Sequence, residues 1–504
     1  MLSRCYSMVF TGLKCTLVEI EVNGTRGQPA LIIIGLPNKA VDESKERVTA
    51  SLVHCGVKIR SMKTVVNLAP AEVRKTSSAL ELAIAVGLLQ LYGNISWNTS
   101  KTLFFGELSL DGNVKKVRGL FSMIMAGKAL GIKRVFFPME NIEEVRMIQG
   151  IELFPVKNIK EILVYNNKKQ PLSFVSSKEE KFSDQGKDEF LSIVGQEQAK
   201  RALAIAAAGK HNMIFIGSPG AGKSVLAKAM RSLLPPLSRK ESIEVTRVYS
   251  IKGISHKGLI TQRPFREPHH SSSLVGMLGG GRNLHPGEIS LAHHGVLFLD
   301  EFLEYPRQVI ESLRQPLEVG KITLTRVTGT VHYPARFMLI AATNPCPCGL
   351  WYQAPGKCTC SDLEKIKYQK KLSGPILDRI DLQVKLISID PERFIKSRKI
   401  ISENNKRPEK DSLEKIREKI YLAQQIQLER QGNSNAFLQY SDLRKLGNIQ
   451  QQAWELLTSV AEKFSLSNRG YLKVLRVART IADLEKSHEV TKKHLTEALV
   501  YRIH

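Results

Sequence analysis

The stretch Gly217-Ser-Pro-Gly-Ala-Gly-Lys-Ser224 decides the fold class, because it is a complete G-x-x-x-x-G-K-S/T phosphate-binding loop. It follows the apolar run Met213–Ile216, which predicts a strand, and precedes Val225–Arg231, which predicts a helix. In such a loop the backbone N–H groups turn inward around phosphates, the lysine reaches the β- and γ-phosphates, and the serine hydroxyl ligates Mg²⁺. A nucleoside triphosphate site is therefore predicted at Gly217, Ser218, Pro219, Gly220, Ala221, Gly222, Lys223 and Ser224.

Two later strands end in polar residues that complete an ATPase site. Val296–Leu299 is an apolar strand followed by Asp300 and Glu301. We expect Asp300 to hold Mg²⁺ together with Ser224, and Glu301 to polarise the attacking water. The run Phe337–Thr343 predicts the next strand and ends at Asn344, whose amide is placed to orient that water.

Two arginines are candidates for stabilising charge on the transferred phosphate. Arg379 follows the third strand and suits a finger that reaches the neighbouring subunit's γ-phosphate. The alternative is a surface ion pair between Asp378 and Arg379 or with their neighbours. Arg469 stands near the start of a predicted helix, from which it could contact the same nucleotide from above.

Composition indicates a soluble multidomain protein with an affinity for polyanions. The chain has 504 residues, too many for one core, and 74 Lys and Arg against 48 Asp and Glu give a net charge of +26. Such a charge favours nucleic acid as a partner, although a lysine-rich surface that serves solubility has the same composition. We see no membrane span and no export signal, and therefore expect a cytoplasmic protein with reduced cysteines.

The pattern of elements divides the chain into four segments. Residues 1–165 alternate strand-like and helical runs, and residues 166–188 are polar and aperiodic like a linker. Residues 189–388 contain the phosphate loop, and residues 389–504 read as a helical lid. The predicted fold class is α/β with a C-terminal helical domain.

The order of these motifs resembles an AAA+ ATPase of the helix-2-insert group, which includes magnesium-chelatase ATPase subunits and MCM helicases. The run Arg263-Pro-Phe-Arg-Glu-Pro-His-His270, the run Pro286-Gly-Glu-Ile-Ser-Leu-Ala-His-His-Gly295 and the run Asn344-Pro-Cys-Pro-Cys-Gly349 are similar to the YifB/ComM family of magnesium chelatase-like proteins. This resemblance covers nearly the whole chain. It implies a homo-hexameric ATPase and, for the best understood branch, a DNA helicase that drives branch migration as transforming DNA is integrated. It also implies an adenine site near Val194, Gly195 and Gln196.

A predicted hairpin is the candidate DNA contact. Residues 321–333 alternate apolar and polar side chains around a turn that contains Gly329. The resemblance places a pore hairpin at this position, and Arg326 falls near its tip. Six copies would form a positive ring that grips phosphates, whereas an ordinary exposed arginine is the alternative.

Four cysteines form two C-x-C pairs, Cys346/Cys348 and Cys358/Cys360. Four thiolates brought together by one short loop suit a structural Zn²⁺. Reduced cysteines in a tight loop and a redox-responsive disulfide are the alternatives.

The N-terminal segment resembles the proteolytic domain of Lon-type proteases, which use a Ser–Lys dyad. The position of the catalytic lysine is taken by Phe121, and the region of Ser77 and Ser78 lacks the family's serine pattern. We therefore expect a non-proteolytic relative of that fold.

The leading interpretation is a hexameric, ATP-driven DNA motor. A metal-chelatase motor subunit is the first alternative, but the chain has no integrin-like Asp-x-Ser-x-Ser site. An ATP-dependent protease is disfavoured by Phe121, and a protein remodeller remains open.

Overall fold

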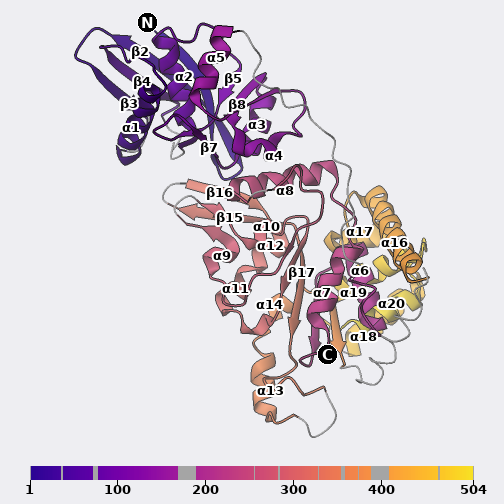
Figure 1. Cartoon of the computed structure of the whole chain (residues 1–504). Helices are drawn as coiled ribbons and strands as arrows, with labels where there is room; N and C mark the ends of the chain where they lie inside the picture. The colour runs from indigo at the N-terminus through magenta and orange to yellow at the C-terminus, as the bar shows by residue number, and fades with distance from the viewer. Residues whose placement is uncertain are drawn as a thin grey trace.

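A computed structural model describes residues 2–35, 38–71, 78–168, 189–254, 256–281, 284–326, 329–352, 358–372, 374–387, 408–463 and 466–502. It has a mixed α/β domain at the N-terminus, a parallel α/β domain in the middle and a helical region at the C-terminus (Figure 1). Most of the predicted linker, residues 169–188, and the start of the predicted lid, residues 389–407, lie outside the described residues.

The N-terminal domain is built on a seven-stranded mixed sheet in the order β3-β4-β2-β1-β5-β8-β9. The first two strands form a long antiparallel hairpin, and the last three pair in parallel. Helix α2 lies inside the domain, because almost every residue of this apolar helix is buried against the sheet. The elements are β1 Leu2–Thr11, β2 Lys14–Thr25, β3 Ala30–Ile34, α1 Asn38–His54, β4 Lys63–Ala69, α2 Glu81–Leu91, β5 Thr102–Phe104, β6 Glu107–Leu108, β7 Val114–Lys115, α3 Leu120–Ala129, β8 Arg134–Pro138, α4 Ile142–Val145, β9 Glu152–Val156 and α5 Ile159–Lys168.

Phe121 is a core residue of this domain. It lies on α3 with 1% of its surface exposed and belongs to an apolar cluster that includes Met8 and Phe105. Ser77 and the side chain of Ser78 lie outside the described residues.

The middle domain contains a five-stranded parallel sheet in the order β11-β14-β17-β10-β18. Three of its strands are buried along their whole length, which explains their continuous apolar sequence. Their carboxyl ends share one edge, where ligands bind in open parallel sheets. The elements are α6 Glu197–Gly209, β10 Met213–Gly217, α7 Lys223–Leu233, α8 Arg239–Lys252, β11 Phe265–Arg266, α9 Leu274–Leu278, β12 Gly279–Gly280, β13 His285–Pro286, α10 Glu288–Leu291, β14 Val296–Leu299, α11 Arg307–Ser312, α12 Arg314–Val319, β15 Lys321–Arg326, β16 Gly329–Pro334, β17 Met338–Thr343, α13 Asp362–Gln369, α14 Gly374–Leu377 and β18 Leu382–Leu386.

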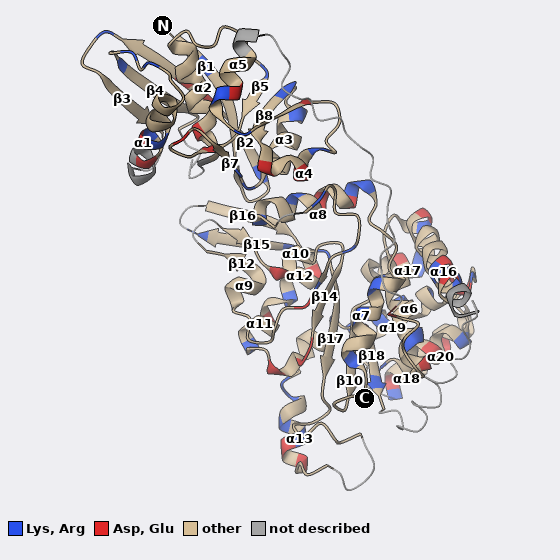
Figure 2. Cartoon of the chain, viewed as in Figure 1, with Lys and Arg blue, Asp and Glu red and all other residues tan. Residues whose placement is uncertain are grey.

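Charged residues of both signs are spread over all three parts of the chain (Figure 2). The net charge of +26 therefore does not by itself locate a nucleic-acid path. None of the described helices combines the length and the apolar character needed to cross a membrane.

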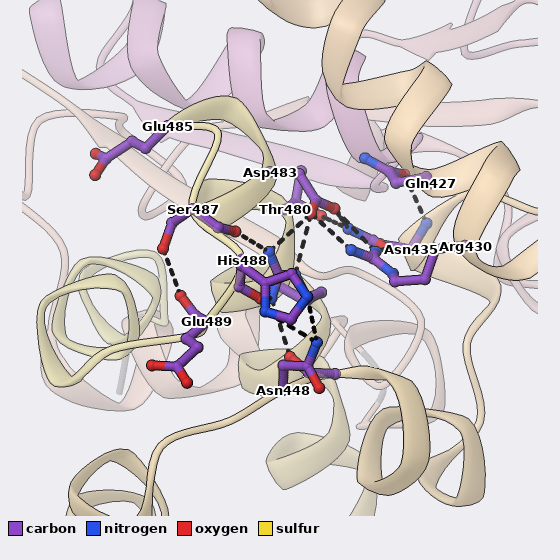
Figure 3. A network of polar contacts seen from close by, with 12 residues as sticks. Gln427, Arg430, Asn435, Asn448, Thr480, Asp483, Glu485, Ser487, His488 and Glu489 are labelled. Carbon is purple, nitrogen blue, oxygen red and sulfur yellow. Dashed lines mark hydrogen bonds and ion pairs between the residues drawn. The ribbon is translucent and has the colours of Figure 1, made fainter.

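The C-terminal region is helical and packs on α6 and α7 (Figure 1). A buried polar network holds its centre together: Arg479 and Arg430 both donate to Asp483, and Asn435 bonds Asp483 and Thr480 (Figure 3). Arg479 is 1% exposed, so its ion pair with Asp483 satisfies two charges that would be costly to bury alone. The helices are α16 Pro408–Gln431, α17 Tyr440–Leu446, α18 Gln451–Lys463, α19 Asn468–Leu484 and α20 Lys492–Val500.

Candidate nucleotide site

The phosphate loop connects β10 to α7, as the sequence predicts. Gly220 and Gly222 have φ of +77° and +86°, and a Cβ atom at either position would meet nothing within 4 Å. Their backbone conformation, rather than lack of space, therefore requires glycine. Gly222 caps α7 without a side-chain hydrogen bond, so the first N–H groups of that helix face an open cradle of the kind that binds anions.

Lys223 lies at the centre of this cradle. Its ammonium group donates to the carbonyls of Gly217 and Ser218, at 2.7 and 3.0 Å, and to Oδ1 of Asn344 at 3.0 Å. Burial lowers the pKa of Lys223, and the carboxylates of Asp300 and Glu301 oppose that shift. The tips of β10 and β17 therefore place a partly desolvated cation between the loop and Asn344.

The two acidic residues after β14 face different directions. Asp300 accepts a hydrogen bond from the Ser224 hydroxyl at 2.5 Å, so a hydroxyl and a carboxylate oxygen converge at the mouth of the loop. Such hard oxygen donors fit Mg²⁺. Glu301 has φ of +50°, and its side chain is 59% exposed at the edge of the sheet.

His270 lies in the site, although the sequence did not predict a role for it. Its Nδ1 lies 3.2 Å from Oε2 of Glu301. It follows β11, the strand next to β14, and this position at the carboxyl edge is the signal that could have identified it. The contact gives the exposed Glu301 side chain a partner at the mouth of the site.

Arg379 and Arg469 approach the same carboxylate. Arg379 donates to Glu318 on α12 at 2.5 Å and to the carbonyls of Arg314 and Pro375. Arg469 lies 3.9 Å from the other oxygen of Glu318. The alternative of surface ion pairs is therefore seen within one chain: Arg379 pairs with Glu318, and Asp378 lies 4.0 Å from Arg469 rather than pairing with Arg379.

A buried lysine ties the lid to the loop that carries Arg379. Lys473 on α19 donates from Nζ to the carbonyls of Leu377 and Ile380, at 2.9 and 3.2 Å. Asn212, just before β10, donates to the carbonyl of Arg379. Hydrogen bonds thus connect helix α19, which carries Arg469, to the loop that carries Arg379.

The segment predicted to hold the adenine lies next to the phosphate loop. Gln196 has φ of +55° and precedes α6. Its side-chain amide donates to the carbonyl of Ile387 at 2.8 Å and approaches that of Ala221 at 3.5 Å. Val194 and Gly195 come directly before it, at the same end of α6.

The four clustered cysteines form a compact group beside the nucleotide site. The Sγ atoms of Cys346, Cys348 and Cys358 are 3.5, 3.6 and 3.8 Å apart, and Cys360 brings all four within 4.8 Å of one another. Tetrahedral Zn²⁺ with Zn–S bonds of about 2.3 Å requires S–S separations of about 3.8 Å. All seven cysteines are free, so the structure shows the cluster in its reduced state.

The cysteine group contacts the phosphate loop, and its thiols differ in acidity: the pKa of Cys348 is lowered, whereas burial and the neighbouring thiols raise the pKa of Cys346 and of Cys360. A hydrogen bond from the Leu350 backbone is the largest influence on Cys348 and helps to lower its pKa to about 6, so its thiolate is available near neutral pH. A Cβ atom on Gly349 would lie 2.5 Å from Cδ of Pro219. The cysteine loop therefore packs directly on the phosphate loop.

A second group of side chains that could ligate a metal is held together by hydrogen bonds instead. Glu244 on α8 approaches His293 and His294, which precede β14. Nδ1 of His293 accepts the backbone N–H of Arg336 at 3.1 Å, and burial lowers the pKa of His293 to about 4. The neutral ring therefore carries its proton on Nε2 and donates it to Glu244, which leaves no lone pair for a metal.

The predicted hairpin is present and consists of β15 and β16. Arg326 is exposed at the end of β15 and pairs in register with Gly329, while residues 327–328 of the turn lie outside the described residues. The Arg326 position thus agrees with the predicted tip.

Family models match all three parts of the chain. A model described as magnesium chelatase, subunit ChlI, matches residues 189–394. One described as subunit ChlI of Mg-chelatase matches residues 20–141, and one described as magnesium chelatase, subunit ChlI C-terminal, matches residues 410–502.

Similar proteins extend over the whole chain. Competence protein ComM of Haemophilus influenzae is 35% identical over 507 residues, which cover 99% of this chain and 97% of that protein. YifB of Escherichia coli is 34% identical over 503 residues, with the same coverage of 99% and 97%. The magnesium-chelatase 38 kDa subunit of Cereibacter sphaeroides is 27% identical over 176 residues, which cover 31% of this chain and 52% of that subunit.

Proposed function

Since the chain belongs to the YifB/ComM family of magnesium chelatase-like ATPases, we propose that it is an ATP-driven DNA motor that works as a homo-hexamer. The observation that carries this proposal is the convergence of Lys223, Ser224, Asp300, Glu301 and Asn344 at one edge of the parallel sheet. A cytoplasmic location is part of the same proposal.

Each residue at this edge has a chemical task. Lys223 and the N–H groups of the phosphate loop would hold the β- and γ-phosphates, and Ser224 and Asp300 would hold Mg²⁺. Mg²⁺·ATP supplies the reacting phosphoryl group and neutralises part of its charge. Glu301 takes up the proton of the attacking water, Asn344 orients that water, and His270 keeps Glu301 in place until the site is filled.

Both arginines are proposed to act on the nucleotide of the neighbouring subunit. Arg379 and Arg469 meet at Glu318, and their hydrogen-bond and ion-pair partners in the described residues belong to the α12 and α14 region rather than to the phosphate loop. A neighbour's γ-phosphate would replace the Glu318 carboxylate as their anionic partner.

The β15–β16 hairpin is the proposed DNA contact, and branch migration during recombination or natural transformation is the proposed task. Support comes from the exposed Arg326 at the hairpin end and from the relative that is named a competence protein. The N-terminal domain is proposed to be non-proteolytic, because the apolar Phe121 is buried in its core at the position where the resemblance places a catalytic lysine.

ATP turnover with and without DNA tests this function. We expect single-stranded or branched DNA to raise the turnover of the wild-type protein, and Arg326→Ala to lose that stimulation because the hairpin no longer grips phosphates. A matched control is Lys493→Ala, which removes an exposed cation from lid helix α20. Turnover of the wild-type protein that does not respond to either DNA form would contradict the proposal.

Cys346, Cys348, Cys358 and Cys360 are proposed to hold one structural Zn²⁺ per chain. Elemental analysis of protein purified without chelators should find about one zinc per chain, as a four-thiolate site implies. Cys358→Ser should lose the zinc and lower ATP turnover, because the freed loop packs on Pro219. The isolated, half-buried Cys55 offers the control Cys55→Ser, which should keep both. Metal-free wild-type protein with full turnover would remove the site.

A further inference from the structure

The turn between β1 and β2 touches the β15–β16 hairpin at Val331, two residues from the hairpin end at Gly329. Gly12 in this turn has φ of +61°, and a Cβ atom there would lie 2.9 Å from Cβ of Val331 and 3.2 Å from its Cγ1. The neighbouring Leu13 packs on a small apolar cluster formed by Leu284, Val331 and Tyr333. A part of the N-terminal domain therefore fills the space beside a hairpin of the middle domain (Figure 1).

This contact is fixed from the middle domain as well. Arg247 on α8 donates to the carbonyl of Leu13 at 2.8 Å. The hydroxyl of Tyr333, a residue that is 1% exposed, donates to the carbonyl of Leu284 at 2.8 Å. The turn thus lies between α8 and the hairpin, and the carbonyl of Leu13 has its hydrogen-bond donor on α8.

The remainder of the domain contact is also specific. The N–H of Gly119 donates to the carbonyl of Ser250 at 3.0 Å, and the hydroxyl of Ser250 donates to the buried carboxylate of Glu144 at 2.5 Å. Further along, the N–H of Gly258 donates to the carbonyl of Glu143. These bonds dock α3 and α4 onto α8, so the turn has a rigid support.

The contact lies close to the hairpin end. Val331 on β16 pairs with Leu324 on β15, and Arg326 follows Leu324 by two residues on β15. Val331 and Tyr333 are buried in the apolar cluster on which Leu13 packs, whereas Arg326 is exposed. A small displacement at Val331 is therefore transmitted along two paired strands to Arg326.

We propose that the Gly12 turn supports the β15–β16 hairpin by packing against it. Through this contact the N-terminal domain sets the position of Arg326 and thereby influences DNA movement. In this role the N-terminal domain positions the hairpin and needs no catalytic residues. The inference rests on the proposed DNA function of the hairpin, while the mechanical contact itself can be measured without DNA.

The test compares two glycines that both have a positive φ, +61° at Gly12 and +81° at Gly56. Gly12→Ala adds a Cβ that collides with Val331, whereas Gly56→Ala, at φ of +81° in the same domain, adds one that meets nothing within 4 Å. Both variants place an alanine at a positive φ and therefore both add backbone strain. A difference between them in hairpin exchange or DNA stimulation therefore measures the effect of the contact with Val331. Gly12→Ala should show faster hydrogen exchange in residues 321–334 and lose most DNA stimulation of ATP turnover, while its turnover without DNA stays near that of Gly56→Ala.

Adding Val331→Ala to Gly12→Ala should restore only part of the stimulation, because it removes the Cγ atoms at 3.2 and 3.8 Å but keeps the Cβ atom at 2.9 Å. The proposal is overturned when Gly12→Ala and Gly56→Ala show equal hairpin exchange and equal DNA stimulation. A wild-type protein that DNA does not stimulate would refute the proposed function instead, and the exchange measurement would still decide whether the turn supports the hairpin.

Discussion

Glu301→Gln should lower ATP turnover by about 10²- to 10⁴-fold, the usual contribution of a general base, while ATP binding is retained. The amide keeps the size and the hydrogen-bonding reach of the side chain but cannot accept the proton of the attacking water. Lys223→Ala should lose binding itself, because its ammonium group lies within the cradle between Gly217, Ser218 and Asn344. Nucleotide affinity and turnover, measured separately, distinguish the two defects.

Glu304→Gln is the matched control for this experiment. Glu304 lies three residues further along the same segment, where its carboxylate contacts Tyr368 and Lys371 rather than the mouth of the phosphate loop. Its neutralisation should leave turnover near the wild-type value. Near-normal turnover in Glu301→Gln would show that another group activates the water.

Arg379→Ala should reduce turnover by about 10³-fold or more, the range found for arginine fingers, and this loss should be repaired by a second inactive variant. In a ring, a site can combine the phosphate loop of an Arg379→Ala subunit with the arginine of a Lys223→Ala subunit. Mixing the two variants should therefore restore part of the turnover, whereas each alone stays inactive. A wild-type protein that hydrolyses ATP as a demonstrated monomer would rule out this arrangement.

The same mixing experiment assigns Arg469. Because Arg469 and Arg379 meet at Glu318, we expect both to serve the neighbouring subunit's site. Arg469→Ala should then be rescued by Lys223→Ala but not by Arg379→Ala, since no site in the latter mixture has both arginines. Rescue by Arg379→Ala would instead show that Arg469 acts on the nucleotide of its own chain.

Local sequence patterns were sufficient for much of the fold and for the nucleotide edge. The phosphate loop, the strand before Asp300 and the strand before Asn344 each have a self-contained signal of apolar residues followed by a turn or polar tip. Parallel pairing then brings their carboxyl ends together without further information. The β15–β16 hairpin and the cysteine pairs were predictable for the same reason, because each depends on residues close in sequence.

Contacts between distant segments could not be predicted in this way. His270 reaches Glu301 only because β11 pairs with β14, and Glu318 meets Arg379 across an interval of 61 residues. The contact of Gly12 with Val331 joins two domains. In each case the sequence has the right residue type, but only the tertiary arrangement supplies its partner.

Movement of a four-way DNA junction is the decisive assay for a DNA motor. Wild-type protein with ATP should convert a labelled synthetic junction into its branch-migrated products, and Glu301→Gln should give no conversion. Arg326→Ala should hydrolyse ATP without moving the junction, since the hairpin end is the proposed DNA contact. The proposed DNA motor is wrong if wild-type protein hydrolyses ATP but leaves the junction unchanged, and the proposed role of Arg326 is wrong if Arg326→Ala moves the junction at the wild-type rate.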